Sequence, residues 1–428
     1  MDFGPSPFII GKVSTSCFGR HTMFKKSFFS DFFKVTSIFG VAIGLVACGG
    51  GSTSATQDCS GASRTPLGNK QYTLVANRNT SSVTVYAVNS TNGALNEISG
   101  SPFPVTGTNS EPFGVAVNPA ATLAFVSNWG NGNVSVFRID ASNGRLNEVE
   151  GSPFSSADGS TSSWQVLISP SGKFAYKLNN STNSISVFSI NNCSGRMTEI
   201  AASPFRVGSA VNLQEMAMTA NGERLYVVAA NTSDLYGYQV NTQSGELIAV
   251  AGNPYVISGS YTDRRNQVVL PGPTHIAINP SGTFLYTANV RTKAVSGYAI
   301  SAAGTLTEIN GSPFAVNNSI YLQQVVFNSA GNGIYVLDAN NDSVYGYQTN
   351  AQTGSLTPMP GSPFGVDSSP TSAVLDITGN YLYITTANSG NTVLGYSISS
   401  SDGSLSAVSG SPYAVPNRFP WRITVAKP

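Results

Sequence analysis

The sequence predicts an all-β protein, a seven-bladed β-propeller with four antiparallel strands in each blade. The first observation is a Ser-Pro-Phe string, or a near variant of it, that occurs seven times along the chain. The copies lie at 101–103, 152–154, 203–205, 253–255, 312–314, 362–364 and 411–413. The intervals between them are 51, 51, 50, 59, 50 and 49 residues, and a period of this size indicates an array of repeated structural units.

The second observation is the content of one unit, residues 112–149. It holds four short segments rich in β-branched and aromatic residues, separated by clusters of Asn, Gly and Ser. Such segments are typical of strands and such clusters of turns, and a four-stranded antiparallel sheet is one propeller blade. Between residues 70 and 428 no stretch has the apolar spacing of an amphipathic helix, so a helical repeat is excluded.

The two ends of the array predict how the ring closes. Residues 72–77 match the second segment of the other units, so the first unit lacks a first strand. Residues 420–425 match a first strand with nothing after it. We therefore expect the C-terminal strand to complete the first blade, which removes the open sheet edges that would otherwise pair with other chains.

Charge and composition narrow the range of partners. Charged residues make up 10% of the chain, and from Cys48 onward 17 Lys and Arg face 19 Asp and Glu, a net charge of −2. A surface that binds nucleic acid needs clustered basic residues. We expect no nucleic-acid partner, and we expect a monomer.

Residues 1–47 resemble the signal peptide of an exported bacterial lipoprotein. Lys25 and Lys26 precede a short apolar run that ends in Leu45-Val46-Ala47-Cys48, and these are features of an export signal. The run is too short to predict a transmembrane helix. Met23 begins a leader of ordinary length, so we expect the true start there.

The resemblance implies that Cys48 is acylated, becomes the first residue of the mature chain and anchors it to a membrane. Gly49 follows it, where an Asp would be expected for retention at the inner membrane, so we expect the outer membrane, on its periplasmic side or at the cell surface. Residues 48–71 include a Gly, Ser and Thr tether. It would hold the propeller, residues 72–428, away from the bilayer.

Two cysteines remain after processing, Cys59 and Cys193. An exported protein meets an oxidising compartment, which favours a disulfide between them, and two unpaired thiols are the alternative. Neither cysteine has a partner at the spacing of a zinc site. We predict no metal and no cofactor.

The start of each first strand predicts where a ligand would bind, because it lies at one mouth of the central channel. Seven residues occupy one equivalent position there: Arg422, Gly114, Gln165, Glu215, His275, Gln324 and Ser372. Most of them are polar, whereas the next position is usually apolar. Convergent polar side chains could bind a polar small molecule. The alternative is that these side chains are polar only because solvent fills the channel mouth.

These seven residues form a ring around the channel mouth and are called the ring residues below. Among them we expect Gln165 and Gln324 to bind the ligand. The preceding position adds Trp164, Trp421 and Phe113, flat apolar surfaces suited to a sugar or another ring.

His275 is the only histidine left after the leader is removed. Histidine can act as a general base near neutral pH, so His275, Glu215 and Arg422 are the candidate catalytic residues. A purely structural hydrogen-bonding role for His275 is the alternative.

The longest interval, 59 residues, holds Arg264 and Arg265 and leads into His275. Long loops in compact domains are often functional, and either arginine could bind an anionic group bidentately. A solvated surface excursion fits the same observation.

The segment 272–289 reads GPTHIAINPSGTFLYTAN. It resembles the seven-bladed lactonase family, which includes 6-phosphogluconolactonase and the fungal carboxy-muconate cyclase, and the likeness extends over residues 72–428. The family motif has Arg where Thr274 stands and Glu where Val290 stands, and its second His has no counterpart here. The resemblance therefore implies the fold and a role for His275. It also implies that most of the family's catalytic site is missing. The missing groups could be replaced by Glu215, Arg422, Arg264 or Arg265.

Two functions follow from these observations. The favoured one is binding of a polar small molecule, a glycan or a partner protein on the loop-rich face, since turns such as Asn128-Trp129-Gly130 resemble those of surface-layer propellers. The alternative is a lactonase that opens a sugar lactone by water attack. His275 would then be the base, and Arg422 or Arg264 would polarise the carbonyl.

Overall fold

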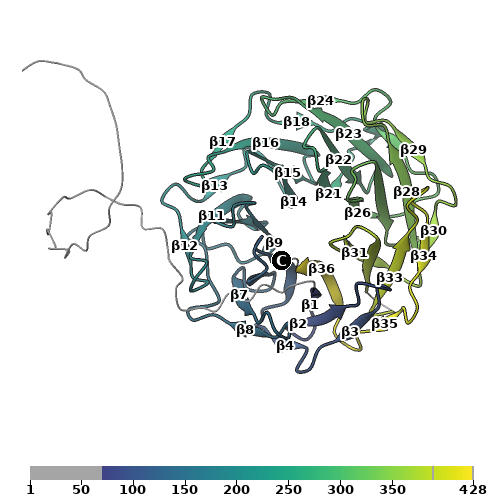
Figure 1. Cartoon of the computed structure of the whole chain (residues 1–428). Helices are drawn as coiled ribbons and strands as arrows, with labels where there is room; N and C mark the ends of the chain where they lie inside the picture. The colour runs from purple at the N-terminus through teal and green to yellow at the C-terminus, as the bar shows by residue number, and fades with distance from the viewer. Residues whose placement is uncertain (1–69, 388–389, 427–428) are drawn as a thin grey trace, which may run out of the picture. The chain divides into compact units, whose positions relative to one another are not determined.

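The structure, a computed structural model, describes residues 70–387 and 390–426. Seven antiparallel sheets stand around a central channel (Figure 1), so the predicted seven-bladed propeller is confirmed. Within the described ranges no helix is long and apolar enough to cross a membrane. The predicted signal peptide, Cys48, Cys59 and almost all of the tether lie outside those ranges.

Each blade has an inner strand, two long middle strands and a short outer strand. The inner strands are β36 (Pro420–Ala426), β5 (Pro112–Val117), β9 (Ser163–Ile168), β14 (Leu213–Met218), β21 (Pro273–Ile278), β26 (Leu322–Phe327) and β31 (Pro370–Leu375). The second strands are β1 (Gln71–Asn77), β6 (Leu123–Asn128), β10 (Phe174–Asn179), β15 (Arg224–Ala229), β22 (Phe284–Asn289), β27 (Gly333–Asp338) and β32 (Tyr381–Thr386). The third strands are β2 (Ser82–Val88), β7 (Val134–Ile139), β11 (Ser184–Ile190), β16 (Asp234–Val240), β23 (Ala294–Ile300), β28 (Ser343–Thr349) and β33 (Thr392–Ile398).

The outer strands are short and are followed by a return segment. The outer strands are β3 (Leu95–Glu97), β8 (Leu146–Glu148), β12 (Met197–Glu199), β17 (Leu247–Ala249), β24 (Leu306–Glu308), β29 (Leu356–Pro358) and β34 (Leu405–Ala407). The return segments are β4 (Phe103–Pro104), β13 (Phe205–Arg206), β18 (Tyr255–Val256), β25 (Phe314–Ala315), β30 (Phe364–Gly365) and β35 (Tyr413–Ala414). Blade 2 has a single bridge at this place, between Val134 and Phe154.

The ring closes as the sequence predicts. Strand β36 lies antiparallel to β1, with Tyr72 opposite Ala426 and Ala76 opposite Arg422. The first blade therefore takes its inner strand from the C-terminal end of the chain. Residues from blades 1 and 7, among them Val75, Ile423 and Tyr383, share one hydrophobic cluster, so this junction is packed like those between other blades.

The Ser-Pro-Phe string has a structural reason in every blade. It lies where the outer strand breaks and the chain turns back along the third strand. In six blades the serine Oγ accepts the hydrogen bond of a third-strand N–H, as in Ser101 with Val85 and Ser312 with Gly297, both at 3.0 Å. In blade 4 the Asn253 Oδ1 accepts from the Gly237 N–H at 2.8 Å. The repeated residue thus replaces a missing rung of the sheet.

Tyrosine hydroxyls tie neighbouring blades together. Five second-strand tyrosines donate to a glycine carbonyl in the outer turn of the next blade; they are Tyr176, Tyr226, Tyr286, Tyr335 and Tyr383. The bond from Tyr383 to the Gly93 carbonyl, 2.8 Å long, joins the last blade to the first.

Candidate functional site

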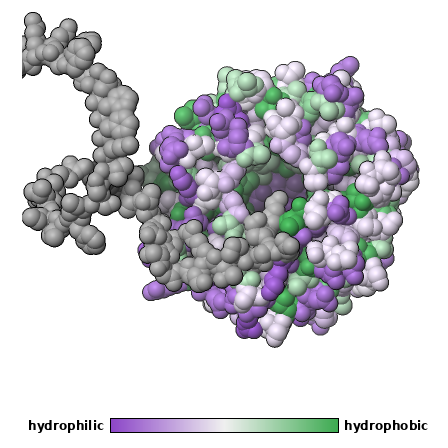
Figure 2. Space-filling model, viewed as in Figure 1, coloured by the Kyte–Doolittle hydropathy of each residue, from purple (hydrophilic) through white to green (hydrophobic). Residues whose placement is uncertain are grey.

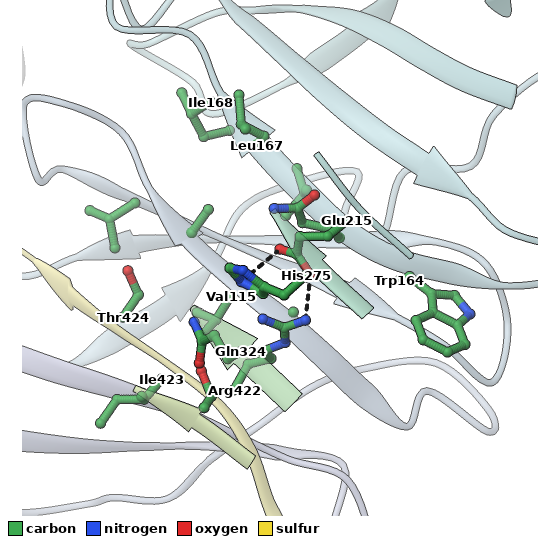
Figure 3. A pocket seen from close by; sticks show the side chains of 16 residues that line it. Val115, Trp164, Leu167, Ile168, Glu215, His275, Gln324, Arg422, Ile423 and Thr424 are labelled. Atoms are coloured by element: carbon green, nitrogen blue, oxygen red, sulfur yellow. Dashed lines mark hydrogen bonds and ion pairs between the residues drawn. The ribbon is translucent and has the colours of Figure 1, made fainter. Parts of the chain in front are cut away.

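The predicted ring of polar residues comes together at the channel mouth. All seven ring residues line one cavity of about 320 Å³, which continues down the channel along β36, β5 and β9 (Figure 3). In each blade the pairing of the inner strand slips by one residue just before the ring position, for example between Pro273 and His275. Such bulges re-aim side chains near binding sites.

An ion pair crosses the channel within this cavity. The Arg422 guanidinium, carried by β36 of blade 1, donates through Nη2 to Oε2 of Glu215 on β14 of blade 4 (Figure 3). His275 Nε2 lies 3.9 Å from the other carboxylate oxygen, Oε1. The Glu215 and Arg422 side chains are only 5% and 13% exposed, so solvent screens the pair weakly.

Burial shifts the pKa values of Glu215 and His275. It raises the pKa of Glu215, while the nearby Arg422 guanidinium opposes that change. We take Glu215 as ionised near neutral pH, because arginine keeps its proton and an unpaired guanidinium in this cavity would be costly. Burial, helped by Arg422, lowers the pKa of His275 well below 6.5. His275 is therefore neutral at pH 7.

His275 is not engaged as a catalytic base in this arrangement. Its Nδ1 is buried and has no hydrogen-bond partner in the described part of the chain. The 3.9 Å separation of Nε2 from Glu215 is too long for a hydrogen bond. A general base also works best with a pKa near the working pH, and His275 has a much lower pKa.

The two ring glutamines join blades. The Gln165 amide donates to the Met216 carbonyl at 3.0 Å and accepts from the Met216 N–H at 2.7 Å. Gln324 makes the same pair of contacts with Ala373 of the next blade, at 3.4 and 2.6 Å. Both glutamines line the cavity, but their amides bond to backbone groups of the next inner strand, which is the edge of its sheet and leaves those groups without a strand partner.

The aromatic residues next to the ring form a contiguous row. The Phe113 ring lies 4.9 Å from Trp164 and 5.2 Å from Trp421, centroid to centroid. Trp164 lines the cavity, and its indole lies apart from the Glu215–Arg422 pair (Figure 3). The row spans the inner strands of blades 1 to 3.

The long interval forms a surface hairpin. Strands β19 (Tyr261–Thr262) and β20 (Val268–Val269) pair with each other, and Arg264 and Arg265 are exposed at its turn. Neither arginine lines the mouth cavity.

Thr274 precedes His275 on β21 and takes part in a contact between blades. Its Oγ1 donates to the Leu322 carbonyl of the next blade at 2.8 Å.

Cys193 is disulfide-bonded. The other cysteines of the chain lie outside the described ranges, so the pairing with Cys59 stays a prediction. Among the residues described, no group of three or more His, Cys, Asp or Glu is placed to hold a metal ion.

A second cavity on the mouth face was not predicted from the sequence. It measures about 420 Å³ and is lined by Arg78, Asn79, Ser81, Asn109, Glu111 and Phe419. These residues come from loops between strands, and their side chains differ from those at equivalent places in other blades. The only available signal was that they flank the starts of β36 and β5.

One face of the propeller is mixed in character around the opening of its channel. Figure 2 shows hydrophilic and apolar residues interspersed around a central hollow, with hydrophilic residues on its wall.

The comparisons with known proteins agree with this architecture. The sequence matches the family described as Lactonase, 7-bladed beta-propeller, over residues 54–164, 114–263 and 267–418. No curated protein is similar enough in sequence to count as a relative.

Solved propellers share the fold at low sequence identity. A candidate 6-phosphogluconolactonase of Bacteroides fragilis is 17% identical with a TM-score of 0.69, covering 84% of this chain and 98% of that one. A similar candidate from Bacteroides uniformis is 15% identical with a TM-score of 0.69, covering 83% and 99%. The periplasmic gluconolactonase PpgL of Pseudomonas aeruginosa is 15% identical with a TM-score of 0.64, covering 83% and 99%. Since the family match spans most of the described propeller, the chain belongs to the seven-bladed β-propeller lactonase family.

Proposed function

We propose that the channel-mouth cavity binds a small, polar, uncharged ring compound such as a sugar, and that binding rather than catalysis is its role. The observation that carries the proposal is the single cavity lined by all seven ring positions and crossed by the Arg422–Glu215 ion pair. Its volume of about 320 Å³ is within the range of small-molecule sites. Because the two charges satisfy each other, a neutral ligand with hydroxyl groups fits better than an anion.

The state of His275 supports binding over catalysis. A base with a strongly lowered pKa accepts protons poorly at neutral pH. The resemblance in the sequence also implies that Thr274 and Val290 stand where the family has Arg and Glu.

Calorimetric titration with a panel of monosaccharides, small lactones and their 6-phosphates tests this proposal. The double variant Glu215→Gln/Arg422→Gln removes both charges together. Arg224→Gln is the matched control. Arg224 also bonds to a neighbouring blade, at Ala302, but it lies at the end of β15 that is away from the channel mouth. We expect a neutral compound to bind, with at least a tenfold loss in the double variant alone. Equal affinity in wild type and double variant would contradict the proposal.

Lactone hydrolysis is the second candidate. It is favoured by the closeness of His275 to Glu215, 3.9 Å, which a bound substrate could shorten. Turnover of gluconolactone or its 6-phosphate that disappears in His275→Ala would establish this activity. Absence of turnover in the wild type would support binding alone.

We also propose that the protein is exported and anchored by a lipid on Cys48, and that it is a monomer. Labelling of the wild type but not of Cys48→Ser by an alkyne-tagged fatty acid is the expected result. Unlabelled wild-type protein would contradict the anchor.

A further inference from the structure

A second cavity lies on the same face as the channel mouth. Its lining comes from three loops, residues 78–81 after β1, residues 105–111 before β5 and residues 415–419 before β36. The end of β1 pairs with the start of β36 at the mouth, Asn77 opposite Pro420. The cavity is therefore built from the loops that surround the start of the inner strands.

The charges in this cavity are paired. Arg78 Nε lies 2.9 Å from Glu111 Oε2, and the Arg78 guanidinium lies over the Trp129 ring, 4.1 Å from its centroid. An arginine held by a carboxylate and a ring face has little attraction left for an anion. The remaining lining is made of amide and hydroxyl groups and the Phe419 ring, which suits an uncharged compound rich in hydroxyl groups.

Aromatic rings connect this cavity to the mouth cavity. Phe419 lines the second cavity and stacks on Trp421, with centroids 5.8 Å apart and planes 9° apart. Trp421 contacts Phe113, and Phe113 contacts Trp164, which lines the mouth cavity. The two cavities are thus the ends of one continuous row of rings.

Phe419 and Glu111, which line this cavity, have a strained backbone conformation. Their φ angles are +51° and +43°, which is rare for residues with large side chains. The equivalent residues of blades 4 and 5 are Asn212 and Gly272, at +65° and +64°, and these two residue types tolerate that conformation. Strained backbone of this kind clusters at binding sites.

We propose that Arg78, Glu111, Trp129 and Phe419 form a second subsite, and that the ligand is a neutral oligosaccharide reaching from it along the aromatic row to the channel mouth. The inference rests on the proposed function, because the mouth cavity is the first subsite. It adds a ligand of two or more sugar units, whereas the mouth cavity alone would take one.

The test is a chain-length series measured by calorimetry on the full chain. The probes are malto-, cello-, xylo- and N-acetylchito-oligosaccharides of one, two and four units. Phe419→Asn removes the ring and keeps a residue that suits the positive φ, and Arg78→Gln removes the stacked cation. Arg145→Gln is the control, because Arg145 lies over Phe103 outside both cavities, at 5.6 Å.

We expect at least one series in which four units bind the wild type and the control tenfold more tightly than one unit. In Phe419→Asn and Arg78→Gln the affinity for four units should fall to that for one unit, which itself should not change. Equal affinity for one and four units in the wild type would overturn the second subsite and leave the mouth site standing. Affinities for one and four units that are both unchanged in Glu215→Gln/Arg422→Gln would overturn the mouth site instead. Failure of every sugar to bind would overturn both.

Discussion

Arg422 and Glu215 meet in a cavity where neither charge is well solvated, and they come from strands that are not neighbours in the ring. A buried pair of this kind contributes little net stability, but removing one partner leaves the other charge uncompensated. The pair therefore fixes the geometry of the mouth more than it stabilises the fold. The same argument explains why the proposed ligand is uncharged.

Removing one residue of this pair should lower the free energy of unfolding much more than removing both residues. We expect Arg422→Met to lower the free energy of unfolding by about 3 kcal/mol, because Glu215 stays buried without a partner. The double variant Glu215→Met/Arg422→Met should recover most of that loss. Urea unfolding of the wild type, Arg422→Met, Glu215→Met and the double variant measures the difference, and additive losses would mean that the two residues do not interact.

The lowered pKa of His275 predicts a pH dependence of stability. The unfolded chain binds a proton on this residue near pH 6.5, whereas the folded protein does so only at lower pH. The contribution of His275 is therefore fully present above pH 6.5 and is lost as the pH falls through the folded pKa. Glu215, with its raised pKa, acts in the opposite direction.

NMR titration of the imidazole protons isolates the histidine from the carboxylate. The resonance that disappears in His275→Gln should keep its neutral chemical shift well below pH 6.5. A midpoint at 6.5 would mean that the side chain is solvated and the mouth is open around it.

Among the structural elements, the second strands hold the ring together through their tyrosines. The sequence pattern predicted the strands themselves, because alternating β-branched and aromatic residues between turn clusters leave few other folds. It did not single out the tyrosine hydroxyls, since a tyrosine in a strand is equally compatible with a purely apolar contact. Nor did it predict that Gln165 and Gln324 bond to the backbone of the next blade, because that contact depends on how the inner strands of neighbouring blades lie side by side around the channel.

The hydroxyl of Tyr383 offers a test of these ties, since it bonds to the Gly93 carbonyl across the closing junction. Tyr383→Phe keeps the ring and leaves a buried carbonyl without its donor, so we expect a loss of about 1 kcal/mol in unfolding free energy. Tyr261→Phe, on the exposed hairpin, is the control and should change nothing. An unchanged free energy of unfolding in Tyr383→Phe would mean that water replaces the lost hydrogen bond.

At the scale of the molecule, seven hydrophobic clusters were found in the described part of the chain, and each is shared by two neighbouring blades. No blade has a core of its own, so stability depends on an unbroken ring. Closure could be predicted from the sequence because the first unit lacks one segment that the C-terminus supplies. The second cavity could not, since it is made by loops that meet only when blades 7, 1 and 2 are assembled.

Deletion of residues 420–428 should therefore abolish cooperative folding. Strand β1 would lose the partner to which Tyr72 and Ala76 are paired, and the junction between blades 1 and 7 would open. Circular dichroism and thermal unfolding of the truncated protein measure this effect. A truncated protein that melts like the full chain would show that closure does not stabilise the ring.

The proposal that the mouth face binds a ligand is tested most directly by intrinsic tryptophan fluorescence. The chain has three tryptophans, and all three, Trp129, Trp164 and Trp421, lie in the loops or strand starts around the mouth. Titration with a sugar that binds by calorimetry should change the emission in a saturable way, with the same dissociation constant. Calorimetric binding without any change in emission would place the ligand elsewhere and contradict the mouth as the binding site.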